Sequence, residues 1–158
     1  MKRLKIEPIN ADAFAPFGQL LPPGAAGAGR QELIEELQND RASARPRLSI
    51  ATTEPKALPL TAVQMERHVH SSQAFAPLDC ASYLVMVAPH GEGGMPDLQK
   101  ARAFRVPGDT GINYKADIWH HPLSPLERIG RFAILTFVDG TAADEQFVDL
   151  PRPVLIEA

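Results

Sequence analysis

The segment Met65-Glu66-Arg67-His68-Val69-His70-Ser71-Ser72-Gln73-Ala74-Phe75 carries the clearest structural signal in this chain of 158 residues. It lies within residues 63–75, which the sequence predicts to be one long strand or a pair of strands. Because alternate residues of a strand share one face, His68 and His70 are expected to point in the same direction. The two imidazoles would then line a common pocket.

A second cluster, residues 111–123, follows a glycine-bearing turn and contains Ile118-Trp119-His120-His121-Pro122, with the only tryptophan of the chain. In an ideal strand His120 and His121 point to opposite faces. We expect the two clusters to form opposite walls of a small barrel. The imidazoles would then converge inside one pocket, and this pocket is the predicted site of the chemistry.

The rest of the chain is also predicted to be mostly β. Fifteen prolines and eleven glycines argue against long helices. Strands are predicted at residues 2–6, 17–21, 47–52, 83–88, 101–106 and 132–138. Short helices are expected only after the capping residue Asn10 and over residues 31–37. Short strands separated by turn signals every 8–12 residues or so are typical of a β-sandwich or barrel.

Length and charge exclude several classes of protein. A chain of 158 residues favours one domain over residues 1–158. The net charge of −3 gives no general attraction to nucleic acid or to an anionic membrane. No apolar run approaches the roughly 20 residues that cross a bilayer, and no signal-peptide core follows the basic start. We therefore expect a cytoplasmic protein in which the lone Cys80 is a small buried thiol.

Three interpretations of the pattern His68-x-His70-x-x-Gln73 are open. A metal site would use neutral imidazole nitrogens together with an oxygen donor. A metal-free site would use one histidine as a general acid or base, oriented by Glu66 or Gln73. The third interpretation is a strand of half-exposed polar side chains. The second histidine cluster favours the first two.

The two clusters together resemble the two-part motif of the cupin superfamily. His68, His70 and Gln73 match the first part, with Gln73 where many cupins have glutamate, and His120 matches the second part. The resemblance implies a mainly β fold, a cupin-like jelly-roll β-barrel (double-stranded β-helix) whose mouth holds a metal or a small ligand.

A more specific resemblance is to the ureidoglycolate lyase family, also called ureidoglycolate hydrolase. The matching segments are Glu66-Arg67-His68, Ser72-Gln73-Ala74-Phe75-Ala76-Pro77, Gly111-Ile112-Asn113-Tyr114 and Ile118-Trp119-His120-His121-Pro122-Leu123. Similar residues also occur at 6–8, 13–18 and 58–60. The resemblance implies an enzyme of allantoin and purine catabolism that splits ureidoglycolate into glyoxylate and urea. It also implies a homodimer, and a divalent metal such as nickel or zinc.

The residue types suit this reaction, which needs a base, an acid and a cation or donors for the carboxylate and the developing alkoxide. The predicted metal ligands are His68, His70, Gln73 and His120. The predicted catalytic residues are His68, His120, His121 and Glu66. Of these, Glu66 or His121 is expected to contact the ligands of the metal or substrate without binding the metal itself, and so to adjust their orientation and basicity. The predicted substrate-binding residues are Arg67, Gln73, Asn113, Tyr114 and Lys115.

The chain also departs from the family in three places. Residues 30–36 lack the histidine expected there, no arginine follows the last apolar strand, and His70 stands where members often have an apolar residue. Two alternatives therefore stay open. One is a metal-dependent cupin enzyme acting on another small hydroxy or oxo acid, and the other is a non-catalytic protein that binds such an acid.

Overall fold

Two β-structures, a closed barrel and an open sheet, make up the fold of this protein. A computed structural model describes residues 1–158. The strands are β1 (Lys2–Pro8), β2 (Gly18–Leu21), β3 (Arg45–Thr53), β4 (Leu60–Arg67), β5 (Gln73–Asp79), β6 (Ser82–Ala88), β7 (Arg102–Pro107), β8 (Gly111–Tyr114), β9 (Trp119–His120), β10 (Ser124–Leu126), β11 (Gly130–Val138) and β12 (Gln146–Glu157). The helical turns are α1 (Ala11–Phe14), η1 (Glu92–Gly94) and η2 (Ala142–Asp144).

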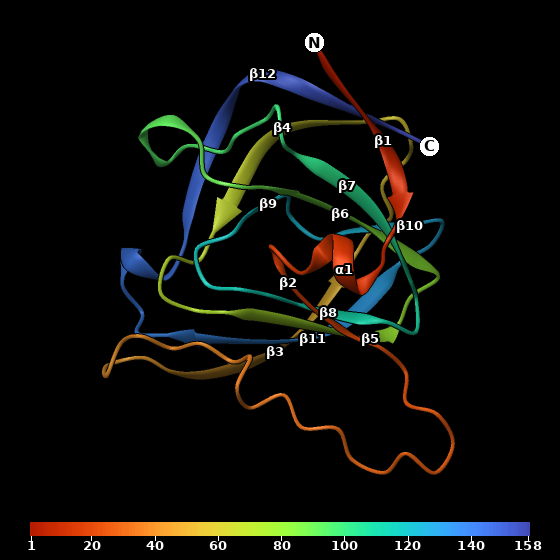
Figure 1. The fold of residues 1–158 in the computed structure, drawn as a ribbon, viewed down its shortest axis with the longest axis vertical. Helices are drawn as coiled ribbons and strands as arrows, with labels where there is room; N and C mark the ends of the chain where they lie inside the picture. The colour runs from red at the N-terminus through yellow and green to blue at the C-terminus, as the bar shows by residue number, and fades with distance from the viewer.

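The barrel is closed by a two-residue strand. Its strands follow the order β6-β7-β1-β12-β4-β9, and β9 pairs with β6 to complete the ring. Strand β1 runs parallel to both β7 and β12, and the other pairs are antiparallel. The start of β1 pairs with the end of β12, and both chain ends lie at the upper right in Figure 1. Closure removes the unpaired sheet edges that would otherwise favour aggregation.

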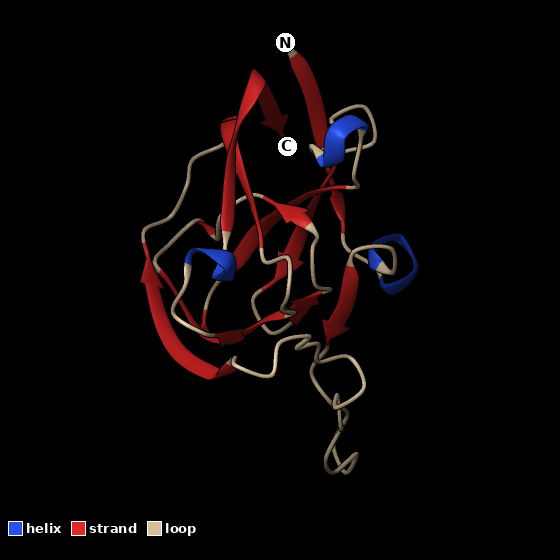
Figure 2. Ribbon diagram, turned by 90° about the vertical axis from the view of Figure 1, so that its left-hand side faces the viewer, coloured by secondary structure: helices blue, strands red, loops and turns tan.

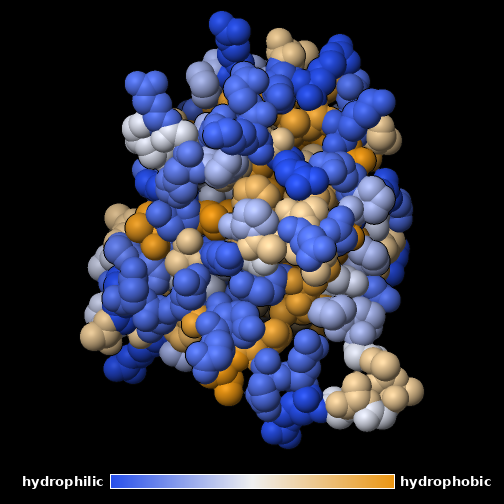
Figure 3. Space-filling view, in the orientation of Figure 1, coloured by the Kyte–Doolittle hydropathy of each residue, from blue (hydrophilic) through white to orange (hydrophobic).

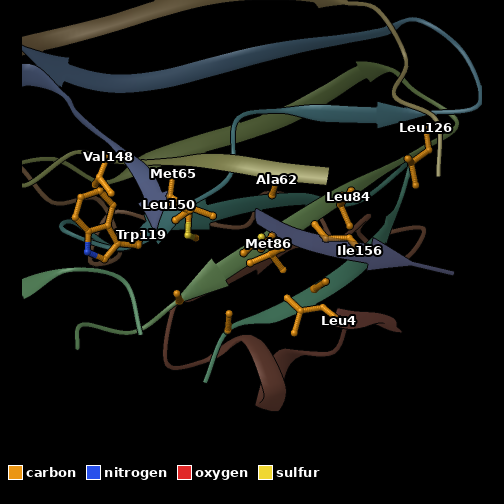
Figure 4. Close-up of a cluster of buried hydrophobic side chains, with 14 residues drawn as sticks. Leu4, Ala62, Met65, Leu84, Met86, Trp119, Leu126, Val148, Leu150 and Ile156 are labelled. Carbon is orange, nitrogen blue, oxygen red and sulfur yellow. The ribbon is translucent and has the colours of Figure 1, made fainter. Parts of the chain in front are cut away.

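The barrel interior is filled by its own hydrophobic core. Figure 4 shows the side chains that converge there from strands around the ring. The buried members are Leu4, Ala62, Met65, Leu84, Met86, Ala88, Ala101, Ala103, Trp119, Leu126, Val148, Leu150, Val154 and Ile156. Full burial of each large apolar side chain contributes about 1.5–3 kcal/mol. The interior is therefore a packed hydrophobic core.

A second core lies between the outer wall of the barrel and a five-stranded sheet of order β2-β8-β5-β11-β3. Strand β6 serves both cores, because Leu84 and Met86 point into the barrel while Tyr83 and Val85 point toward the sheet. This double burial explains why residues 83–88 form a continuous apolar run. Helix α1 adds Phe14 to the second core, and the sheet lies below the barrel in Figure 1.

Most of the predicted elements are confirmed, and the fold is the mainly β, cupin-like barrel that the sequence indicates. Asn10 caps α1 by accepting the Ala13 backbone N–H at 2.9 Å. The predicted helix over residues 31–37 is wrong, because this segment forms only a turn within a long connection. Seven residues are too few to form a stable helix without a packed face. This connection extends away from the strands in Figure 2.

Strand β12 was not indicated by the sequence, because Pro151 and Pro153 lie inside it. Its pairing with β4 shifts register between Asp149 and Val154, and the prolines fall in this irregularity. Proline lacks an N–H and is tolerated in a sheet mainly at such positions. The barrel therefore contains a strand that proline content alone argues against.

Hydrophilic residues predominate on the face shown in Figure 3, with apolar residues in smaller patches between them. None of the helices has the length and apolar character needed to span a lipid bilayer. Cys80 is buried and carries a free thiol, as predicted.

Candidate active site

Glu66, His68 and His120 bring one ligand atom each to within 4.8 Å of one another. Glu66 is on β4 directly opposite His120 on β9, and His68 follows the end of β4. The Glu66 Oε1 and His120 Nε2 atoms are 3.4 Å apart. The histidines therefore meet as the sequence predicts, but on neighbouring strands of one wall rather than on opposite walls.

This cluster lies outside the barrel interior. Trp119 and His120 alternate along β9, so Trp119 fills the barrel core while His120 points toward the five-stranded sheet. The His120 ring stacks on Tyr114 of β8, with ring centroids 4.1 Å apart. The expectation that the imidazoles face the interior of the closed barrel is corrected here, because that space is filled by apolar side chains.

Backbone carbonyl groups fix the orientation of the His68 and His120 rings. His68 Nδ1 lies 3.0 Å from the Asp144 carbonyl oxygen, and His120 Nδ1 lies 2.9 Å from that of Ile118. A carbonyl can only accept, so both Nδ1 atoms donate, and in the neutral imidazole each Nε2 then keeps a lone pair. The two Nε2 atoms are buried and have no hydrogen-bond partner. Each ring thus directs an unused lone pair into the cluster.

The pKa shifts agree with this arrangement. Burial alone would raise the pKa of Glu66, but the attraction of His120 and His68 outweighs it and leaves this pKa below its ordinary value. Burial lowers the pKa of His68, and the adjacent His120 lowers it further. At neutral pH the cluster therefore combines a carboxylate with a neutral His68 imidazole.

A charged network holds the loop that orients His68. Arg41 contacts Asp139 at 3.2 Å and Asp144 at 3.0 Å. Asp144 also accepts the backbone N–H groups of Asp139 and Gly140. Hydrogen bonds from Thr141 lower the pKa of Asp139 to about 2. The carbonyl that fixes the His68 ring thus belongs to a loop stabilised by several charge-assisted bonds.

The five-stranded sheet contributes a polar row opposite the cluster. Tyr114, Gln73, Thr136 and Arg47 are cross-strand neighbours on β8, β5, β11 and β3, so their side chains share the inner face. Gln73 Oε1 and Thr136 Oγ1 are buried without a hydrogen-bond partner. Burial raises the pKa of Tyr114, which therefore keeps its proton. Buried unpaired polar atoms are costly, so this row is suited to a bound ligand.

A pocket of about 370 Å³ reaches this region from the surface. Its lining residues are Arg47, His68, Val138, Thr141, Ala142, Asp144, Glu145 and Phe147. His68 belongs to both the pocket and the cluster, so a small molecule that enters the pocket meets the cluster at His68. Sequence reasoning missed Arg47 and Thr136. Alternation along residues 47–52 was visible, but the sequence does not show which face turns inward.

His70 does not join the cluster. Strand β4 ends at Arg67, and His70 lies in the following turn with its Nδ1 2.9 Å from Asp40. The prediction that His68 and His70 share a strand face is therefore wrong, because neither belongs to a strand. Arg67 points away from Glu66, lying 4.4 Å over the Trp119 ring and 3.0 Å from Asp117.

The remaining predicted residues divide into two groups. Asn113 lies on the opposite face of β8 from Tyr114, where it donates to Gln19 and to the Glu36 carbonyl. Lys115 donates to the Ala15 carbonyl at 2.8 Å, away from the cluster. His121, by contrast, lies outside the two-residue strand β9 and lines a small cavity together with Tyr114. The rule that neighbouring residues of a strand point to opposite faces therefore does not fix the direction of His121.

The Glu66, His68 and His120 side chains fit a divalent metal. In their neutral form the two imidazoles offer buried Nε2 lone pairs, and Glu66 adds a carboxylate oxygen within 4.8 Å of them. The 3.4 Å separation between Glu66 and His120 matches the spacing of about 3.4 Å expected between ligands held 2.0–2.1 Å from one ion. Two histidines and one carboxylate leave coordination positions open for a substrate.

The fold and site define a cupin-like β-barrel with a histidine–carboxylate cluster beside its wall. The model of the family described as ureidoglycolate lyase matches residues 1–157. A ureidoglycolate lyase of Rhodobacter capsulatus is 38% identical, with 99% of each chain covered. One from Pseudomonas aeruginosa is 32% identical, over 99% of this chain and 97% of the relative. The chain belongs to the ureidoglycolate lyase family.

Among solved structures, the chain is similar to RmlC from Streptococcus suis, determined in complex with dTDP-D-xylose. The TM-score is 0.45 at 7% sequence identity, over 62% of this chain. The chain spans 46% of the length of that structure.

Proposed function

We propose that this protein is a ureidoglycolate lyase that cleaves the C–N bond of ureidoglycolate to give glyoxylate and urea. The main supporting observation is the cluster of Glu66, His68 and His120 beside an open pocket, in a chain that belongs to the family. The reaction removes the hydroxyl proton, forms the aldehyde C=O bond, breaks the C–N bond and delivers a proton to the urea nitrogen. It needs one proton acceptor and one proton donor.

We further propose that Glu66, His68 and His120 hold a divalent metal such as nickel or zinc. When bound, such an ion supplies positive charge that stabilises negative charge on a substrate oxygen. The proton transfers then fall to the side chains around it. Tyr114 keeps its proton at neutral pH, because burial raises its pKa, so its hydroxyl can donate a hydrogen bond. His121 donates its Nδ1–H to the Pro122 carbonyl, which leaves Nε2 free to accept a proton.

The activity is tested by product analysis with pure ureidoglycolate. We expect glyoxylate and urea in equal amounts, well above the rate of spontaneous decay. Ammonia in place of urea would indicate hydrolysis of the ureido group and would contradict the lyase proposal. Tight binding of ureidoglycolate without any product would indicate the non-catalytic alternative.

Activity is expected to depend on a metal held by Glu66, His68 and His120, and not on the pair His68 and His70. Dialysis against a chelator should lower activity at least 100-fold, and a divalent metal should restore it. Glu66→Gln should lower the metal content measured by elemental analysis. His70→Gln is the matched control and should leave both metal content and activity unchanged, because His70 binds Asp40 outside the cluster. Full activity in metal-free protein would instead support general acid–base catalysis alone.

The protein is also proposed to be cytoplasmic and homodimeric. The free thiol of Cys80 and the absence of any disulfide partner suit a reducing compartment. Self-association is supported by β3, which is an edge strand of the five-stranded sheet and exposes Leu48 and Ile50. Light scattering should give twice the mass of one chain, and the mass of a single chain would contradict the dimer.

A further inference from the structure

Arg47 is the cationic residue of the open pocket that has no partner within the protein. It lines the pocket together with His68, yet it forms no ion pair or side-chain hydrogen bond. The arginines nearest the cluster are already engaged, Arg41 with two aspartates and Arg67 with Asp117. The Arg47 guanidinium therefore keeps all of its donors for a ligand.

The strand register places Arg47 at the end of the polar row. Arg47 pairs with Thr136, Thr136 pairs with Gln73, and Gln73 pairs with Tyr114, whose ring stacks on His120. The row thus runs from the exposed guanidinium at one end to the buried cluster at the other. A small molecule bound along it would meet a positive charge first and the histidines last.

The two ends of the row are suited to different chemical groups of a ligand. Arg47 offers a planar set of N–H donors that matches a carboxylate in two parallel hydrogen bonds. Gln73 Oε1 and Thr136 Oγ1 are buried oxygens without partners, and both can accept N–H groups. Glu145 lines the same pocket and repels a carboxylate placed on its side. The row therefore suits a molecule with a carboxylate at one end and amide N–H groups at the other.

We infer that Arg47 is the residue that binds the substrate carboxylate, with the ureido group directed toward Gln73 and Thr136. The inference rests on the proposed function and specifies how ureidoglycolate is oriented at that site. This orientation places the carbon that carries the hydroxyl group between Arg47 and Gln73, on the side of the pocket that His68 lines. It also assigns the carboxylate to a residue other than Arg67 and Lys115, which the sequence predicted to bind the substrate but which are both held elsewhere.

The test compares Arg47→Met and Arg47→Lys with a matched control. We expect Arg47→Met to raise KM for ureidoglycolate about 10- to 100-fold with a much smaller change in kcat, since a charge-assisted hydrogen-bond pair is lost. Arg47→Lys should recover part of the loss. The control is Arg131→Met on β11, whose side chain is exposed on the outer face of the same sheet, and its KM should match that of the unaltered protein.

Two inert analogues separate this inference from the proposed function. Ureidoacetate lacks the reactive hydroxyl group but keeps the carboxylate, and its primary amide is neutral. Calorimetry should show that the unaltered protein prefers ureidoacetate over the amide at least 10-fold, and that Arg47→Met removes this preference. If the preference persists in Arg47→Met, the role of Arg47 is overturned even when ureidoglycolate is cleaved. If the preference is lost in Arg47→Met but no turnover occurs, the carboxylate site stands and the lyase proposal fails.

Discussion

His120→Gln is expected to lower the rate of glyoxylate and urea release about 1000-fold or more. His120 contributes a buried Nε2 lone pair to the cluster, faces Glu66 at 3.4 Å and stacks on Tyr114. An amide has similar size but cannot present an imidazole lone pair in the same position. Loss of a group that acts directly in catalysis typically costs 10²–10⁴-fold in rate or so. Steady-state kinetics with product detection measure the effect.

The control must show that the loss arises at the cluster and not from misfolding. His120 is almost fully buried, so each variant should be compared by circular dichroism and urea unfolding before kinetics. His70→Gln changes the same residue type outside the cluster and should retain nearly full activity. Activity of His120→Gln within 10-fold of the unaltered protein, with a native spectrum, would contradict the proposed site.

Sequence periodicity predicted the strands well but not how they pair. The apolar run 83–88 and the alternating segments at 2–6 and 47–52 all form strands at the expected places. Their partners are long-range, and the ring closes through β9, which has only two residues. No periodic pattern can be read in two residues. A barrel was predicted, but the order of strands around the ring and its separate core could not be derived from periodicity.

The same limit explains the partial success at the site. His68 and His120 were correctly expected to meet. Glu66 was predicted as a catalytic residue but not as a metal ligand, and the register that pairs it with His120 is visible only in the structure. His70 was included on the assumption that the strand stays extended through His68 and His70. The chain turns after Arg67, and a turn removes the alternation on which that inference depended. Arg47 was missed because alternation does not reveal which strand face is buried.

Trp119→Ala is expected to reduce the free energy of unfolding by about 3–5 kcal/mol, the usual cost of removing a large aromatic side chain from a packed core. Trp119 has no exposed surface and packs in the barrel interior with Met65 and Val148. Its indole Nε1 also donates to the Gly94 carbonyl at 2.9 Å, and Arg67 lies over its ring. Urea unfolding monitored by circular dichroism measures the change.

A second variant separates packing from the hydrogen bond. Trp119→Phe keeps an aromatic ring in the core but removes the indole N–H, so it should cost clearly less than Trp119→Ala. Ile34→Ala, at an exposed position in the connection between β2 and β3, is the control and should change stability little. A cost below about 1 kcal/mol for Trp119→Ala would contradict a filled barrel interior. It would also undermine the site, because Trp119 and His120 are the two residues of β9 and the barrel core fixes the direction in which His120 points.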